Sequence, residues 1–162
     1  MEQMYTGDRN ETESVDLMRL AGRDAIRAIL SEDARVASLP IIQKAGKISD
    51  LINAFAEVLG NSEAENQYKT VLIAAGFEVC NKLVLAESSH YYNDKLEQAL
   101  LVKMAIKKVL HQLAGIDVLG LSDINYSNLI KSEIEEFRII FNEWVLSFDK
   151  STFSSDGWNI PL

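Results

Sequence analysis

Apolar residues recur every three or four positions through most of this chain, and this spacing constrains its fold more than any other feature. A period near 3.6 places apolar side chains on one side of a helix, whereas a half-buried strand would alternate, and no sustained alternation occurs. Only two prolines are present, so long helices meet few interruptions. The pattern therefore predicts an all-α fold, an antiparallel-leaning bundle of about five helices with no sheet.

Capping and turn residues set the expected limits of these helices. Pro40 suits the first turn of the second helix. Ser62 and Glu65 form a capping-box pattern, which opens the third. The expected helices span about residues 14–30, 40–59, 62–86, 94–115 and 127–148.

The limits of the fourth helix rest on three residues. Asn93 or Asp94 is expected to cap its start, and Gly115 is expected to end it. Residues 116–125 then form an apolar connector that should be partly buried.

A length of 162 residues fits one domain. Residues 1–13 are expected to form a flexible N-terminal segment and residues 14–148 the helical bundle. Residues 149–162 are expected to pack on or near the bundle as a tail, with Phe153 and Trp158 as anchors.

Charge and composition exclude several kinds of partner. The formal net charge is −8, and an acidic chain repels the phosphate backbone, so nucleic-acid binding is disfavoured. No apolar run reaches the length that spans a bilayer, and the polar N-terminal stretch predicts no signal peptide. A single cysteine, Cys80, forms no disulfide within the chain, which favours a cytoplasmic location. The acidic surface suits a basic protein partner.

The residue types that bind metals and cofactors are too few for the usual sites. Glu87 and His90 have the Glu-x-x-His spacing of di-iron bundles, but His111 has a lysine at the matching position. One cysteine and two histidines match no usual zinc spacing. No phosphate loop, dinucleotide motif or serine nucleophile motif occurs, so no metal and no cofactor is predicted. A small helical enzyme whose carboxylates come from distant helices stays open as an alternative.

His111 has two interpretations, a solvated surface histidine or a phosphoryl acceptor. On a helical wheel it lies opposite the apolar side of its helix, beside Lys107 and Lys108. A solvated histidine is the simple interpretation. Exposure and neighbouring cations are also what a phosphoryl-accepting histidine requires.

The stretch "HQLAG", residues 111–115, resembles part of the histidine phosphotransfer signature. Leu113 and Gly115 match that signature, whereas Ala114 stands where the family has a lysine. In that family the helix continues past the glycine, while here it is expected to end there. The resemblance implies a signalling domain that uses His111. We nevertheless predict that His111 is not phosphorylated.

Three arginines, Arg19, Arg23 and Arg27, form a ridge along one side of the first expected helix. Guanidinium groups bind carboxylates or phosphates well, and the neighbouring Ile26 and Leu30 would help to exclude water. The ridge is therefore the predicted partner-binding surface. A solvated face neutralised by nearby aspartates is the alternative.

Ile139 and Leu146 fall opposite the apolar side of the last expected helix. They are either isolated surface residues or an interface, for example of a homodimer.

These features together favour a non-enzymatic cytosolic module that binds another protein, as an adaptor, a regulator or an acidic inhibitor of the immunity-protein type.

Overall fold

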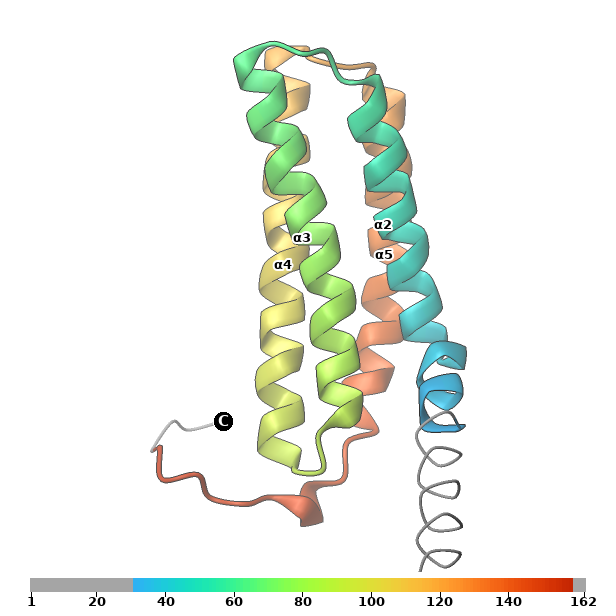
Figure 1. Ribbon diagram of the computed structural model, residues 1–162, viewed down its shortest axis with the longest axis vertical. Helices are drawn as coiled ribbons and strands as arrows, with labels where there is room; N and C mark the ends of the chain where they lie inside the picture. The colour runs from blue at the N-terminus through green and yellow to red at the C-terminus, as the bar shows by residue number, and fades with distance from the viewer. Residues whose placement is uncertain (1–30, 159–162) are drawn as a thin grey trace, which may run out of the picture. The chain divides into compact units, whose positions relative to one another are not determined.

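The computed structural model describes residues 31–158. Contacts divide the chain between Ala37 and Ser38; residues 31–37, the described part of the first unit, are helical. The second unit contains four long helices and a short 3-10 helix, and no strand occurs in residues 31–158 (Figure 1). The elements are α2 (Pro40–Val58), α3 (Glu63–Ser88), α4 (Tyr92–Leu119), α5 (Ile124–Leu146) and η1 (Lys150–Thr152).

The four helices α2 to α5 form an antiparallel bundle, which confirms the all-α prediction. Each helix packs against the next in the chain, and α2 also packs against α5, which closes the ring. Consequently α3 and α5 lie at diagonal corners (Figure 1). The helix expected at 14–30 and the segment 1–13 lie outside the described residues.

Local signals set the starts of α2 and α3 as expected. Pro40 occupies the first turn of α2, where its missing N–H costs nothing. Ser62 and Glu65 form the complete capping box: the Glu65 N–H donates to Ser62 Oγ at 3.3 Å, and the Ser62 N–H donates to Glu65 Oε2 at 2.9 Å. Two of the free N–H groups of the first turn are thereby satisfied.

The expected start of α4 was wrong by two residues. The helix begins at Tyr92, and Tyr91 occupies the cap position without a side-chain hydrogen bond. Asn93 is buried and does not cap the helix. Its Oδ1 instead accepts a hydrogen bond from the backbone N–H of Ser154 at 3.1 Å. A long-range contact thus uses the side chain that local reasoning assigned to capping.

The expected end of α4 was also wrong, because the helix runs through Gly115 to Leu119. The left-handed residue that ends it is Gly120, with φ of 63°. Gly115 serves close packing, since a Cβ there would lie 2.6 Å from Tyr68 Oη. The connector is therefore shorter than expected, and Val118 and Leu119 are exposed on the last turn.

The core runs the length of the bundle and is built from the inward stripes of the four helices. Its innermost residues are Ile41, Ile48, Ile52, Leu72, Val79, Leu83, Val102, Val109, Leu113, Ile116 and Ile130. The aromatic rings of Phe137, Phe141, Trp144 and Phe148 pack one against the next along α5 and its end.

A charged cluster ties α2 to α5. Lys44 Nζ lies 2.5 Å from Glu133 Oε2 and also pairs with Glu136, and Lys47 Nζ lies 2.6 Å from Glu133 Oε1. The side chains of Glu133 and Lys44 are only 9% and 12% exposed. Hydrogen bonds from the two lysines lower the pKa of Glu133, and hydrogen bonds to Glu133 and Glu136 raise the pKa of Lys44.

The tail after α5 contacts the bundle through residues other than those expected. Phe148 is buried, η1 packs against α4, and the Ser154 N–H bonds to Asn93. Phe153 and Trp158, the anchors expected from the sequence, are both largely exposed. The tail is held at its first half, where the chain leaves α5 beside the start of α4.

Gly115 and Tyr68 give a first testable prediction. Alanine is favoured over glycine by about 1 kcal/mol inside a helix, but here its Cβ would collide with the Tyr68 ring. We expect Gly115→Ala to destabilise the wild-type chain and to stabilise the Tyr68→Ala variant. Urea unfolding of the four proteins in a double-mutant cycle measures this coupling. A coupling below about 0.5 kcal/mol would contradict it.

Candidate protein-interaction surface

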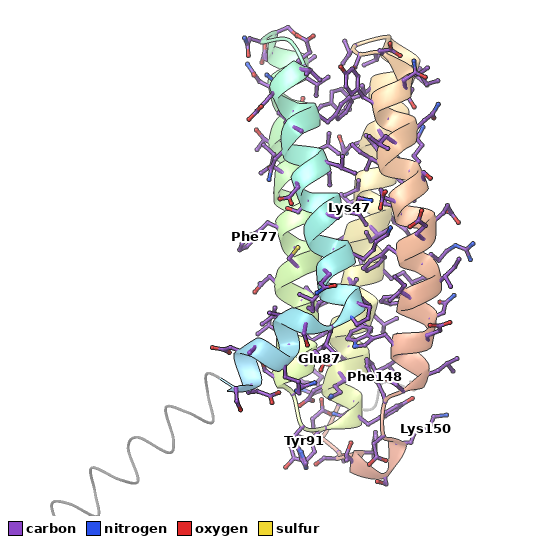
Figure 2. The ribbon with its side chains drawn as sticks, turned by 90° about the vertical axis from the view of Figure 1, so that its right-hand side faces the viewer. Lys47, Phe77, Glu87, Tyr91, Phe148 and Lys150 are labelled. Atoms are coloured by element: carbon purple, nitrogen blue, oxygen red, sulfur yellow. The ribbon has the colours of Figure 1, made fainter. Side chains whose placement is uncertain are left out.

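The solvent side of α3 is apolar along most of its length. From position 70 to position 88 the eight most exposed residues are uncharged, and five of them are hydrophobic; the charged residues of this stretch, Glu78, Lys82 and Glu87, are half-buried along its edges. These eight residues are Thr70, Ile73, Ala74, Phe77, Asn81, Val84, Leu85 and Ser88. Phe77 is 69% exposed, and its ring projects away from the bundle (Figure 2).

The inner side of α3 is apolar as well, since Leu72, Ala75, Val79 and Leu83 are buried in the core. A helix in a soluble protein is normally polar on its outer side, and one that is hydrophobic all round is usually covered. The core accounts for the inner side alone. The outer side therefore has the composition of a surface that another molecule covers.

Two residues of α4 extend this surface sideways. Lys108 Nζ lies 3.0 Å from Glu78 Oε2, and this ion pair shows the register of the antiparallel helices α3 and α4. In that register Leu85 is level with Leu100, and Met104 follows one turn later; all three are exposed. We call the exposed large hydrophobic residues of the two helices the α3 face: Ile73, Phe77, Val84, Leu85, Leu100 and Met104.

His111 is exposed on α4, as the helical wheel predicted, and Lys107 and Lys108 are exposed one turn earlier. Lys108 is already paired with Glu78. His111 also lines a hollow of about 380 Å³ between α3 and α4, together with Gln112 and Tyr68. The histidine is thus accessible to a partner, with one lysine engaged elsewhere.

The helical context of "HQLAG" differs from the expectation. Because α4 continues past Gly115, the histidine and the glycine lie on one uninterrupted helix. In this respect α4 matches the phosphotransfer signature, in which the helix also continues past the glycine. The Tyr68 ring, however, covers the place where Gly115 leaves space.

The two residues expected to form an interface on the last helix lie at the surface of α5. Ile139 and Leu146 are 58% and 84% exposed on α5. They lie on the helix diagonally across the bundle from α3. The exposed Glu143 lies between them along α5, and the exposed Glu136 lies one turn before Ile139. The arginine ridge and its two apolar neighbours lie outside the described residues.

One partly buried polar cluster has the residue types of a catalytic site. Asp117 Oδ2 accepts hydrogen bonds from Ser127 Oγ at 2.9 Å and from Lys131 Nζ at 2.6 Å. Ser127 is fully buried, so a substrate has no access to its hydroxyl. The cluster therefore joins the end of α4 to the start of α5.

The remaining reactive groups are dispersed. Burial raises the pKa of the Cys80 thiol, which disfavours the nucleophilic thiolate. Within residues 31–158, no three acidic, histidine or cysteine side chains gather where they could hold a metal ion. Among the described helices, none is long and apolar enough to cross a membrane.

The α3 face was missed in the sequence, although a signal for it was present. Between Lys69 and Lys82 the only charged residue is Glu78. A wheel drawn over this stretch places apolar residues on both sides of the helix, and the sequence reasoning followed only the inner stripe.

Comparisons of this chain with protein-family models, with curated proteins and with solved structures found no match. The candidate surface accordingly rests on the composition and geometry of the chain itself.

Proposed function

We propose that this protein is a non-enzymatic, cytoplasmic protein-interaction module, an adaptor, a regulator or an acidic inhibitor, which binds its partner through the α3 face. The observation that carries the proposal is the uncharged, largely apolar outer side of α3. Burying apolar area is the main favourable contribution to protein association, and exposed aromatic residues such as Phe77 are frequent hot spots.

The chemistry of the face also describes the partner. An apolar helical surface is complementary to an apolar helix or groove of similar length. The net charge of −8 favours a partner with basic residues around that apolar centre, since opposite charges speed association and orient the complex. We therefore propose a basic protein that presents an apolar helix or groove.

A comparative pull-down from the native host tests this proposal. Wild type and Phe77→Asp are used as baits in parallel, and bound proteins are identified by mass spectrometry. The proposal requires a basic protein that wild type retains and the variant loses. Equal retention by both baits would remove the α3 face as the site.

Two further baits separate the surfaces expected from the sequence. Arg19→Glu/Arg23→Glu/Arg27→Glu tests the arginine ridge, and Leu146→Asp tests the outer side of α5. If either bait loses the partner while Phe77→Asp retains it, the contact lies there instead. Sedimentation of the wild type reports whether the partner is a second copy of the chain. Turnover in a broad hydrolase screen would favour the enzyme alternative.

Phosphotransfer through His111 is the second candidate, supported by the exposure of His111 on an uninterrupted helix. Against it stand the pairing of Lys108 with Glu78 and the Tyr68 ring over Gly115. We expect no acid-labile phosphate on the protein after incubation with acetyl phosphate or a phosphorylated receiver domain. His111→Gln should leave partner binding unchanged. Label on wild type that disappears in His111→Gln would establish the phosphotransfer function.

A further inference from the structure

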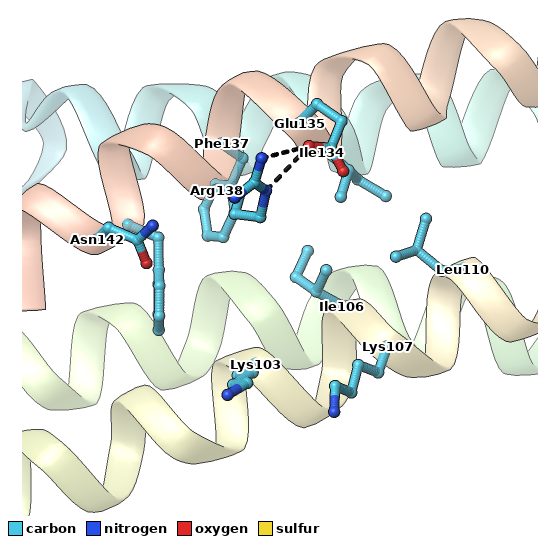
Figure 3. A pocket seen from close by; sticks show the side chains of 10 residues that line it. Lys103, Ile106, Lys107, Leu110, Ile134, Glu135, Phe137, Arg138 and Asn142 are labelled. Carbon is cyan, nitrogen blue, oxygen red and sulfur yellow. Dashed lines mark hydrogen bonds and ion pairs between the residues drawn. The ribbon is translucent and has the colours of Figure 1, made fainter.

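A groove of about 340 Å³ lies between α4 and α5, the most loosely packed neighbouring helices of the bundle (Figure 3). Its floor is hydrophobic: Ile106 and Leu110 come from α4, and Ile134, Phe137 and Phe141 from α5. In Figure 3, Ile106 and Leu110 extend from α4 toward α5. This volume lies at the lower end of the range for small-molecule sites.

The rim of this groove is cationic, in contrast to the chain as a whole. Lys103 and Lys107 border it from α4, and Arg138 borders it from α5. Glu135 is the only acidic residue of the lining. It forms an ion pair with Arg138, whose Nη2 lies 2.9 Å from Glu135 Oε2. Three cations and one carboxylate leave a local charge of about +2 beside an apolar floor, in a chain of net charge −8.

Lys103 and Lys107 place two positive charges close together at the rim of the groove. They stand four residues apart on one helix, where like charges repel. In the described part of the chain, neither has a carboxylate within ion-pair distance. Both are exposed on flexible stems, so their ammonium groups can turn toward an anion at the rim.

We propose that this groove binds a small amphipathic anion, namely a medium-chain aliphatic carboxylate. The alkyl chain lies over Ile106, Leu110 and Phe141, the half-buried apolar residues of the lining, and the carboxylate pairs with Lys103 and Lys107. An apolar body with a single charged head matches an apolar floor with a cationic edge.

The groove lies between α4 and α5, whereas Phe77, the most exposed residue of the α3 face, lies on α3. Leu100 and Met104, the two α4 residues of that face, stand one turn before Lys103 and Lys107, so the two surfaces adjoin on α4.

Decanoate below its micellar concentration is the probe, and decanol and decyltrimethylammonium are the matched neutral and cationic ligands. Trp144 contacts Phe141, with ring centroids 5.7 Å apart, so its fluorescence reports on the groove. The second of the two tryptophans, Trp158, is removed by Trp158→Phe. We expect decanoate to bind at least about tenfold more tightly than decanol at low salt, and decyltrimethylammonium more weakly than either.

Charge variants locate the head group. Lys103→Glu/Lys107→Glu should abolish the preference for decanoate over decanol. Lys69→Glu/Lys150→Glu, which changes the net charge equally at other sites, should retain at least half of it. Phe77→Asp should leave decanoate binding unchanged, which separates this site from the α3 face.

Three results would overturn the proposal. They are equal affinities for decanoate and decanol in the wild type, a decanoate preference that survives Lys103→Glu/Lys107→Glu, and loss of decanoate binding in Phe77→Asp. Binding of an acidic amphipathic peptide at this groove without any binding of decanoate would also overturn it, in favour of a protein ligand.

Discussion

Phe77→Asp should weaken partner binding by at least about 30-fold, which corresponds to the 2 kcal/mol or more expected of an aromatic hot spot. The substitution removes the one aromatic ring of the α3 face and places a charge among its apolar residues. Burying that carboxylate without a partner opposes association further. Surface plasmon resonance with the partner recovered by pull-down measures the change.

The fold should be unaffected by this substitution, because Phe77 is 69% exposed and contributes little to the core. Its far-ultraviolet circular dichroism and urea midpoint should match the wild type. Ile139→Asp is the matched control, since it makes the same change at an apolar residue that is 58% exposed on α5. Binding lost in Ile139→Asp but retained in Phe77→Asp would move the interface to α5.

Glu133→Gln should lower the free energy of unfolding by about 2–3 kcal/mol. Glu133 accepts from both Lys44 and Lys47, and its side chain is only 9% exposed. Glutamine keeps the shape but removes the charge, so Lys44 loses its main compensating carboxylate in a nearly buried position and keeps only Glu136. Urea titration at pH 7 measures the loss.

Glu135→Gln provides the control on the same helix. It breaks the pair with Arg138, in which both side chains are 63% exposed, and exposed pairs contribute less than about 1 kcal/mol. A Glu133→Gln loss no larger than the Glu135→Gln loss would show that the α2–α5 cluster adds little to stability.

The pH dependence of Glu133→Gln follows from the direction of the pKa shift. The folded-state pKa of Glu133 lies below its ordinary value of 4.5, because the lysines stabilise the carboxylate. Its contribution is therefore present above pH 4.5 and is lost as the pH falls through the folded pKa. The unfolding free energies of wild type and variant should converge in that acidic range. A difference that stays constant below pH 4 would contradict this explanation.

Local signals in the sequence were sufficient for the class of fold and for several helix ends. The period of the apolar residues predicted α2 to α5, and the capping box at Ser62 and Glu65 lies within four residues, so chain neighbours alone form it. His111 was correctly placed on the outside of its helix, because a helical wheel needs no knowledge of other helices.

Features that depend on a second helix did not follow from such signals. Glycine is the residue type that most often ends a helix, but the role of Gly115 depends on Tyr68, which lies 47 residues earlier in the chain. Likewise, Asn93 has the chemistry of a cap, yet it bonds to Ser154 in the tail. In both cases a contact between distant segments prevailed over the local preference.

The candidate sites depended on packing even more strongly. A hydrophobic stripe shows which side of a helix needs cover, but it does not show how many sides the neighbouring helices cover. In the bundle α2 and α4 flank α3 and leave its outer side open. The groove between α4 and α5 has the same origin, because it exists where two helices pack loosely and bring Lys103 and Lys107 near Arg138. Periodicity is a property of one helix, whereas exposure and clustering are properties of how several helices pack.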